Sequence, residues 1–326
     1  MVEGYKFEGG RVLPCEEGAR VLVFTAPTDE ERARLVGELG IDEHDMRSAL
    51  DPDELGRLEI DGSGATLILK VPRNYTSEDQ LLFTVTSIGL FLGPRRLVIV
   101  TTDELDLFDD RNVKRVANER DATLKILYGI IAHFLGHLKV INMLSESLEK
   151  RVNASMGNRY LLDMFTLEKS LVYFVNGIAS NQMVLEKMMA AHGRLKLTKA
   201  QTQTLDDIVI ENQQCSKQAE IYTNILTGLM DARGSVVNNN LSVLMKKLTV
   251  ISVIFMPMNV LAGMGGMSEF SAWTRSVPWY VAYTLFLFFL GIVGLATYWV
   301  LKKSGLERRE GETPPERRRR KGRDRY

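Results

Sequence analysis

The sequence predicts a membrane protein of the α+β class, with an N-terminal cytoplasmic α/β domain, a long helical stalk and two C-terminal transmembrane helices. Three observations lead to this prediction. Short β-rich runs alternate with helical ones up to about residue 110, no proline occurs between Pro94 and Pro257, and two long runs near the C-terminus contain no charged side chain. The averages hide this segregation, since a formal net charge of +0 and 45% hydrophobic residues are ordinary for a soluble protein.

The same observations divide the 326 residues into four parts. We expect a cytoplasmic α/β domain over residues 1–120 and a cytoplasmic helical middle with the stalk helix over 121–245. A transmembrane domain over 246–301 would hold two helices, at about 246–264 and 277–301, and a short outer loop. A basic cytoplasmic tail would cover 302–326.

The N-terminal part shows the sequence period of strands. Apolar, β-branched runs occur at 20–26, 65–71, 81–93 and 95–102, separated by clusters of Gly, Pro and Asp that are typical of turns. Between the first two runs, Thr28 and Glu31 have the spacing of a capping box, which predicts a helix that starts there. These patterns together predict a small α/β domain.

The middle of the chain is helical by its apolar period. Three long helices are predicted, with breaks near residues 153–158 and 191–194, and the third begins at about Thr198. Because the third helix has no stop signal before the apolar run, it would extend about 98 Å from Thr198 to Ala262. We therefore expect one helix to pass from the cytoplasm into the bilayer.

Two charge-free runs support the membrane prediction. Residues 248–268 and 276–301 contain no Asp, Glu, Lys or Arg, and each is long enough to cross a hydrocarbon layer of about 30 Å as a helix. A helical hairpin buried in a soluble core is the alternative, but two such long runs almost back to back are rare there. We therefore predict two transmembrane helices.

The flanks of these helices predict their orientation. Lysine pairs stand at 246–247 before the first helix and at 302–303 after the second, whereas the connection holds only Glu269 and Arg275 as charged residues. The positive-inside rule then places both termini in the cytoplasm. No signal-peptide core is visible at the N-terminus, and two cysteines are too few for a disulfide framework, as expected in a reducing compartment.

Polar residues mark one face of the first predicted membrane helix. At about 100° per residue, seven positions stay within a stripe of about 120°. This polar stripe consists of Ser242, Met245, Leu248, Ser252, Met256, Asn259 and Gly263. Polar side chains at membrane depth seek a bundle interior or water, so the stripe is a candidate pore lining, and since one chain cannot enclose a pore, oligomerisation is implied. The alternative is that the stripe packs against the second membrane helix.

Residues 240–270 resemble the first membrane helix and the following loop of the CorA family of divalent metal ion transporters, which includes the ZntB-like zinc transporters. The matching residues are Met245, Lys246, Leu248, Thr249, Phe255, Pro257, Ala262, Gly263, Gly266 and Met267. The wider layout is similar too, so the resemblance covers the whole chain in architecture. It implies a funnel-shaped homopentamer, an integral protein of the bacterial inner membrane, whose first membrane helix lines a central pore for divalent cations.

The resemblance also implies roles for residues of the polar stripe. Met245 and Leu248 would form hydrophobic constrictions that resist wetting when the pore is closed. Ser252, Asn259 and the Gly263 carbonyl would offer oxygen ligands to a passing ion.

Metal-sensing carboxylates are a further implication of the resemblance. Asp206 and Asp207 of the stalk correspond most nearly to the cytoplasmic sensing residues of the family, with Glu78 and Asp79 of the α/β domain as partners. An acidic pair on a helix is also ordinary solvated surface, which is the alternative interpretation.

One residue departs from the family signature. Gly-Met-Asn of the family corresponds here to Gly266, Met267 and Ser268, which Glu269 follows. In the family the asparagine amides hold a hydrated cation at the pore mouth, and a serine hydroxyl is a shorter and weaker ligand. We therefore expect weakened Mg²⁺ selectivity, with Mg²⁺, Zn²⁺, Co²⁺ or Ni²⁺ as transported or regulatory ions. We also expect the glycines at 263–266 to form a tight, re-entrant-like turn in which five backbones approach the pore axis.

No catalytic motif is present in the sequence. Glycine-rich phosphate loops after a strand, nucleophile elbows and cysteine quartets are absent, so we predict no enzyme and no cofactor other than the cations. His133 and His137 have the i, i+4 spacing of a zinc pair, but no acid lies between them, and their apolar surroundings favour packing.

The C-terminal tail is strongly basic. Residues 302–326 hold eleven Lys or Arg against five acidic residues, a composition that also occurs in nucleic-acid-binding segments. Because the tail begins directly after a membrane helix, contact with anionic lipid or with the cytoplasmic end of the pore is favoured. The predicted partners are further copies of the chain, membrane lipid and divalent cations, and not nucleic acid.

Two functions of different classes follow from the sequence. The first is a homopentameric channel or transporter for divalent cations. The second is a CorA-like membrane sensor or scaffold that has lost efficient transport, which the missing asparagine permits.

Overall fold

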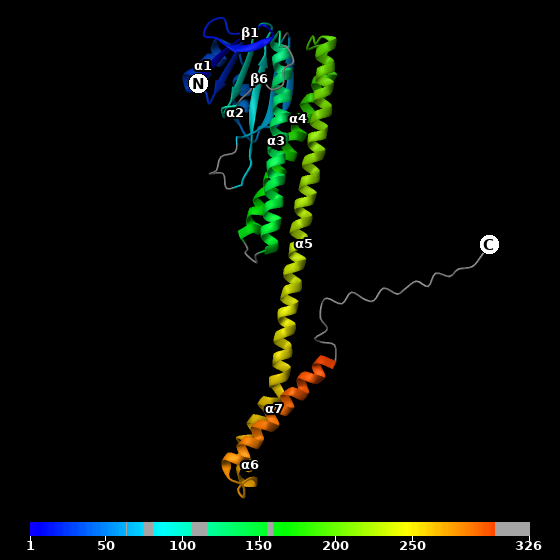
Figure 1. Cartoon of the computed structure of the whole chain (residues 1–326). Coiled ribbons are helices and arrows are strands. Elements are labelled where there is room, and N and C mark those ends of the chain that lie inside the picture. Colours follow the sequence, from blue (N-terminus) through cyan, green and yellow to red (C-terminus); the bar gives the residue numbers. More distant parts are fainter. Residues whose placement is uncertain (63, 75–80, 106–115, 155–158, 304–326) are drawn as a thin grey trace, which may run out of the picture. The chain divides into compact units, whose positions relative to one another are not determined.

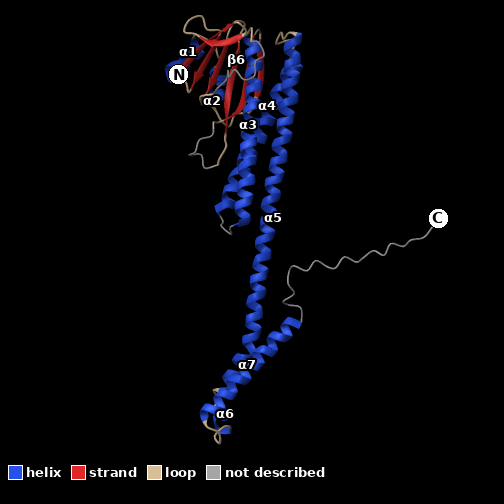
Figure 2. Cartoon of the chain, in the orientation of Figure 1, coloured by secondary structure: helices blue, strands red, loops and turns tan. Residues whose placement is uncertain are grey.

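The structure is a computed structural model that describes residues 1–62, 64–74, 81–105, 116–154 and 159–303. Of residues 151–154, 159 and 269–271 it describes the backbone alone. The chain divides into two compact units, Met1–Ala232 and Arg233–Tyr326. All strands of the described residues belong to the first unit (Figure 2).

A seven-stranded sheet forms the centre of the first unit. Its strands are β1 (Val2–Glu8), β2 (Arg11–Pro14), β3 (Val21–Thr25), β4 (Arg57–Asp61), β5 (Gly64–Pro72), β6 (Val85–Leu92) and β7 (Leu97–Thr101). They lie in the order β2-β1-β3-β7-β6-β5-β4. Only β3 and β7 run parallel, with Val21 opposite Leu97, and every other neighbouring pair is antiparallel.

Both faces of the sheet are covered, which explains the continuous apolar runs of its central strands. In β7, Leu97 and Ile99 enter the larger core, whereas Val98 and Val100 enter a smaller core on the opposite face. Helices α1 (Asp29–Gly37) and α2 (Glu43–Leu50) cover the smaller core, and α3 (Glu119–Ala154) and α4 (Arg159–Ala190) cover the larger one (Figure 1).

Polar contacts fix α4 to the sheet as well. The Asn181 side chain of α4 accepts a hydrogen bond from the Lys70 backbone N–H of β5 and donates one to the Lys70 carbonyl, both at 2.7 Å. Its neighbour Ser180 accepts a hydrogen bond from the Gly56 N–H at 2.7 Å. A buried amide that pairs with both backbone groups of a strand residue leaves neither of them unsatisfied.

The predicted strand runs are confirmed as β3, β5, β6 and β7. The capping box at α1 is confirmed too, because Thr28 Oγ1 accepts from the Glu31 N–H at 3.3 Å and Glu31 Oε2 accepts from the Thr28 N–H at 2.9 Å. The predicted elements did not include β1, β2, β4 or α2.

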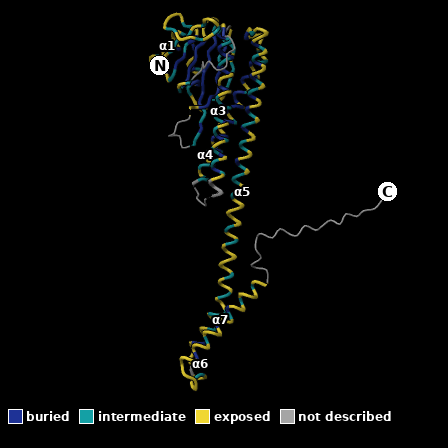
Figure 3. Tube along the Cα trace, in the orientation of Figure 1, coloured by how far each residue is buried: buried dark blue, intermediate teal, exposed yellow. Residues whose placement is uncertain are grey.

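Three long helices follow the sheet, as predicted. α3 ends at Ala154 and α4 at Ala190, close to the expected breaks, and α5 (Lys199–Gly265) is one continuous helix of 67 residues. The first part of α5 contributes Leu205, Ile208 and other residues to the larger core. Farther along α5 most residues are exposed (Figure 3).

The second unit contains the end of α5, the short helix α6 (Ser268–Trp273) and α7 (Trp279–Lys303). By length and composition alone, α3, α5 and α7 are the described helices that are apolar and long enough to cross a membrane. In the most apolar 18-residue window of α3, 50% of the residues are buried inside the fold. The corresponding share is 6% for α5 and 11% for α7. The apolar side chains of α3 are therefore accounted for by the core of the first unit.

Candidate functional site

The polar stripe of α5 is exposed along its whole length. Ser252, Asn259 and Gly263 are exposed, and the larger apolar members Met245, Leu248 and Met256 have exposed fractions of 62%, 58% and 71%. Among the described residues of the second unit, none covers this face of the helix in the single chain.

The opposite face of α5 packs against α7. Ring atoms of Phe286 lie 2.5 Å from the place that a Cβ on Gly265 would occupy, and Met258 Sδ lies 2.9 Å from the corresponding place on Gly294. Ile254, Met258, Leu261 and Gly265 are among the least exposed residues of this segment. At about 100° per residue their centre lies about 160° around the helix from the centre of the polar stripe. Within the single chain, the stripe therefore does not pack on α7.

The hydroxyl groups of this segment are oriented by the helix itself. Ser252 Oγ donates to the Leu248 carbonyl at 2.9 Å, and Ser242 Oγ donates to the Asn238 carbonyl at 3.0 Å. Because the hydroxyl proton is used within the helix, the oxygen lone pairs of Ser252 are directed away from it and can act as acceptors or cation ligands.

The glycine-rich end of α5 differs from the expected turn. α5 stays helical to Gly265, and the Gly266 N–H then donates to the carbonyls of Ala262 and Gly263, both at 3.2 Å. α6 begins immediately afterwards, at Ser268. Gly265 is needed for the close approach of Phe286, so the glycines do not all serve the approach of five backbones. The expectation of a re-entrant turn built from them is wrong. Gly263, by contrast, has open space around the position of a Cβ.

The remaining residues of the predicted mouth are only partly described. Gly266, Met267 and Ser268 are exposed. For Glu269 only the backbone within α6 is described. The role of these residues at the pore mouth therefore stays a prediction.

The predicted sensing carboxylates lie on the outer side of α5 in the first unit. Asp206 and Asp207 are exposed, while their neighbours Leu205 and Ile208 are buried in the larger core. Their predicted partners Glu78 and Asp79 lie outside the described residues. The sensing role stays a prediction.

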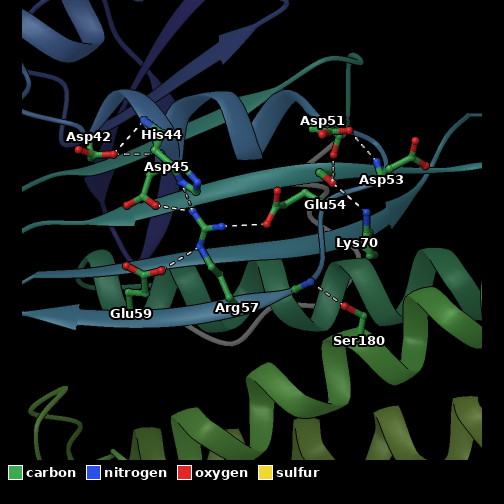
Figure 4. A network of polar contacts seen from close by, with 12 residues as sticks. Asp42, His44, Asp45, Asp51, Asp53, Glu54, Arg57, Glu59, Lys70 and Ser180 are labelled. Atoms are coloured by element: carbon green, nitrogen blue, oxygen red, sulfur yellow. Dashed lines mark hydrogen bonds and ion pairs between the residues drawn. The ribbon is translucent and has the colours of Figure 1, made fainter.

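A cluster of metal-ligand groups that the sequence did not predict lies at the start of α2. One ligand atom each of Asp42, His44 and Asp45 lies within 4.8 Å of the others. However, Arg57 Nη2 of β4 lies 2.6 Å from Asp45 Oδ1 and 3.2 Å from His44 Nδ1, so the guanidinium holds the position that a metal cation would take (Figure 4). Asp42 is already used as the N-cap of α2.

The charge of Arg57 is balanced within this cluster. Burial lowers the pKa of Arg57, but the hydrogen bond and charge of Asp45, with the charges of Glu59 and Glu54, raise it overall. The Glu54 carboxylate accepts from Arg57 Nη1 at 2.8 Å. We interpret this cluster as a structural ion-pair network that joins α2 to β4.

The two histidines of α3 pack as the sequence suggested. His137 lies with its ring centroid 5.5 Å from that of Phe83 and 6.0 Å from that of Phe174, both in edge-on arrangements. Burial, with the charge of nearby His133, lowers the pKa of His137 to about 4. The Nε2 atoms of His133 and His137 also face each other at 2.9 Å, which packing alone does not require.

Comparison with known protein sequences gives a consistent family. A family model described as CorA-like Mg²⁺ transporter protein matches residues 16–303. The chain is 26% identical over 252 residues to the cobalt/magnesium transport protein CorA of Methanocaldococcus jannaschii, a match that covers 74% of this chain and 77% of that protein. A match to the protein of the same name from Thermotoga maritima is 30% identical over 97 residues and covers 30% of this chain and 27% of that protein.

Comparison with solved structures shows the same fold. The complete structure of the CorA magnesium transporter from Methanocaldococcus jannaschii matches with a TM-score of 0.77 and 20% identity, over 94% of this chain and 98% of that chain. The full-length CmaX protein matches with a TM-score of 0.67 and 15% identity, over 92% and 96% of the two chains. The ZntB cytoplasmic domain from Vibrio parahaemolyticus matches with a TM-score of 0.57 and 11% identity, over 73% and 98%.

Proposed function

Because the chain belongs to the family of CorA-like Mg²⁺ transporter proteins, we propose that it moves divalent cations through a membrane pore that the polar stripe of α5 lines. Members of this family are integral membrane transporters and not enzymes. One observation supports this proposal above others: Ser252 and Asn259 lie on an apolar helix, on a face that α7 leaves uncovered. Such side chains need water or a polar partner at membrane depth.

In this proposal α5 and α7 are the membrane-spanning helices. The spans at about 246–264 and 277–301 fall within them, and the cytoplasmic parts are residues 1–120, 121–245 and 302–326. The lysines at 246–247 and 302–303 place both termini in the cytoplasm by the positive-inside rule. The membrane would be a bacterial inner membrane, by analogy with the family.

The pore would lie on the axis of a homopentamer. Met245 and Leu248 of five chains would close it by excluding water, and Ser252 and Asn259 would supply oxygen ligands. The Gly263 carbonyl, which accepts a hydrogen bond from the Gly266 N–H at 3.2 Å, retains a second lone pair for an ion.

The ions would be Mg²⁺ and more easily dehydrated cations such as Zn²⁺, Co²⁺ and Ni²⁺. Mg²⁺ gives up its water reluctantly and depends on oxygen ligands that bind through that water. Ser268 offers a hydroxyl in place of an amide, so Mg²⁺ loses more of its advantage than a transition-metal cation does. The matched relatives are named as transporters of both cobalt and magnesium.

The serine at the position of the family asparagine also favours a second candidate function. A chain without the asparagine amides at its pore mouth could be a CorA-like membrane sensor or scaffold that has lost efficient transport. In that case Asp206 and Asp207 would still bind cytoplasmic cations, but no flux would follow.

The test is uptake of Mg²⁺ and Zn²⁺ into liposomes that contain the purified chain. We expect uptake above that of empty liposomes, and we expect Leu248→Ser to raise the leak several-fold, because five hydroxyls hydrate a dry constriction. Leu244→Ser is the matched control, since Leu244 is 59% exposed, against 58% for Leu248, and lies outside the polar stripe. Absence of uptake by the unmodified chain and by Leu248→Ser would favour the sensor. An equal rise of the leak in Leu248→Ser and Leu244→Ser would contradict the pore lining.

A further inference from the structure

We propose that His133 and His137 of α3 form a binding site for a transition-metal dication. The site lies in the first unit, apart from the polar stripe and from the Arg57 cluster. The inference does not depend on the proposed transport function, because it concerns binding by two side chains that the pore does not use.

The geometry of the pair suits a metal ion. The two residues are one helical turn apart, and their Nε2 atoms face each other at 2.9 Å. With metal–nitrogen bonds of about 2.0–2.1 Å, two ligand nitrogens lie about 2.9 Å apart at a right angle and about 3.3 Å apart in a tetrahedron. The pair therefore fits a square-planar or octahedral ion as it stands, and it fits a tetrahedral ion after a shift of a few tenths of an ångström.

The His137 ring is held in place by aromatic side chains. Phe83 and Phe174 contact the His137 ring edge-on at 5.5 and 6.0 Å, and both phenylalanines are almost fully buried. The two histidines are only half-buried, so the core does not enclose the pair. A site whose ligands are already oriented loses little conformational entropy when it binds.

The facing nitrogens also require a lone pair between them. Two Nε2–H groups could not face each other at 2.9 Å, so at least one ring presents a lone pair and the other donates to it. An ion between them needs both lone pairs, and the donor ring provides the second one when its proton moves from Nε2 to Nδ1. No oxidant, reductant or other reactant is needed.

The ligand set decides which cations bind. Among the described residues, no third His, Cys, Asp or Glu atom joins this pair in a cluster within 4.8 Å, so water would fill the remaining positions. Imidazole nitrogen suits Zn²⁺, Ni²⁺, Co²⁺ and Cu²⁺, whereas Mg²⁺ takes oxygen ligands. The site would therefore distinguish transition-metal cations from Mg²⁺.

Protection from chemical modification tests the site on the unaltered full-length chain without an affinity tag. With Mg²⁺ in excess to occupy oxygen sites, Zn²⁺ should slow the reaction of His133 and His137 with diethyl pyrocarbonate at least about tenfold, as followed by peptide mass spectrometry. His44 and His192, the other two histidines, are internal controls and should react at an unchanged rate. Equal rates with and without Zn²⁺ at all four positions would overturn the proposal.

Calorimetric titration with Zn²⁺ in excess Mg²⁺ gives the independent test. His133→Gln and His137→Gln should each weaken one binding event per chain by at least about tenfold, since loss of even a second-shell partner costs 10–100-fold in metal affinity. His44→Gln is the matched control, because His44 belongs to the competing cluster beside Arg57. Loss of the event in His44→Gln, or its persistence when both α3 histidines are replaced, would contradict the assignment.

Discussion

At the scale of single residues, the proposed pore depends on the oxygen atoms of a few side chains. Ser252 donates its proton within α5 and keeps its lone pairs available, as a pore oxygen must. Ser268 stands at the start of α6, and the resemblance in sequence aligns it with the asparagine of the family signature. A hydroxyl reaches less far than an amide, so this one position is where ion preference should be most sensitive to substitution.

Ser268→Asn should shift the flux toward Mg²⁺. The amide oxygen restores a ligand that can hold a hydrated ion through its water, and Mg²⁺ profits most because it dehydrates most reluctantly. The measurement is competitive uptake of Mg²⁺ and Zn²⁺ into liposomes by the two forms, where we expect a several-fold change in the ratio. Strong Mg²⁺ preference in the unmodified chain, or an unchanged ratio, would indicate that selectivity resides deeper, at Asn259 or Ser252.

Residue contacts were predictable from the sequence where they are local. Thr28 and Glu31 are three residues apart, so their reciprocal hydrogen bonds follow from spacing alone.

Long-range contacts could not be predicted in this way. The contact of Arg57 with Asp45 depends on how α2 meets the sheet. The contact of Asn181 with Lys70 depends on how α4 meets the sheet, and these two residues are 111 positions apart in sequence. The spacing of His133 and His137 was visible, but the meeting of their nitrogens depends on side-chain rotamers, and Phe83 and Phe174 hold that of His137.

At the scale of elements, the packing of α5 on α7 leaves the polar stripe uncovered. Long helices could be predicted, because an apolar helical period without proline extends over α3, α4 and α5 as far as Pro257. The face of α5 that meets α7 could not be predicted, because small residues stand on several faces of this segment. Gly263 and Gly265 are two residues apart, yet only Gly265 has a side chain of α7 against it. Contact with Phe286, rather than composition, distinguishes the two glycines.

Gly294→Leu should therefore destabilise the second unit. Met258 Sδ lies 2.9 Å from the place of a Cβ on Gly294, so a larger side chain overpacks this contact, at a cost of about 1–3 kcal/mol. Gly291→Leu is the matched control, because it lies one turn earlier on α7 with open space around its Cβ position. Thermal unfolding in detergent should show a midpoint several degrees lower for Gly294→Leu alone. Equal midpoints in the two variants would mean that α5 and α7 do not pack in this way.

At the scale of the whole molecule, the proposed pore lining on the exposed face of α5 implies further copies of the chain. In the most apolar segment of α5, which carries Ser252 and Asn259, only 6% of the residues are buried in the single chain. The apolar side chains of this segment are suited to lipid, but its polar side chains are not. Polar groups facing hydrocarbon are costly, so a membrane form in which the stripe meets other stripes around water is the more stable one.

We expect native mass spectrometry of the chain in lipid nanodiscs to give the mass of five copies of 36.8 kDa each.

We also expect aqueous thiol reagents to distinguish α5 from α7. In a background without Cys15 and Cys215, Ser252→Cys should react with a charged, membrane-impermeant reagent, because its face lines water. Leu295→Cys of α7 is the matched control: it is 70% exposed in the single chain, yet it should be protected by lipid. Exposure in the single chain is thus separated from exposure to water, which is the property that a pore lining requires. Reaction at position 295 with protection at position 252 would exchange the roles of α5 and α7. A mass other than that of five copies would overturn the pentamer. In that case the labelling alone would decide whether the stripe face of α5 lines water.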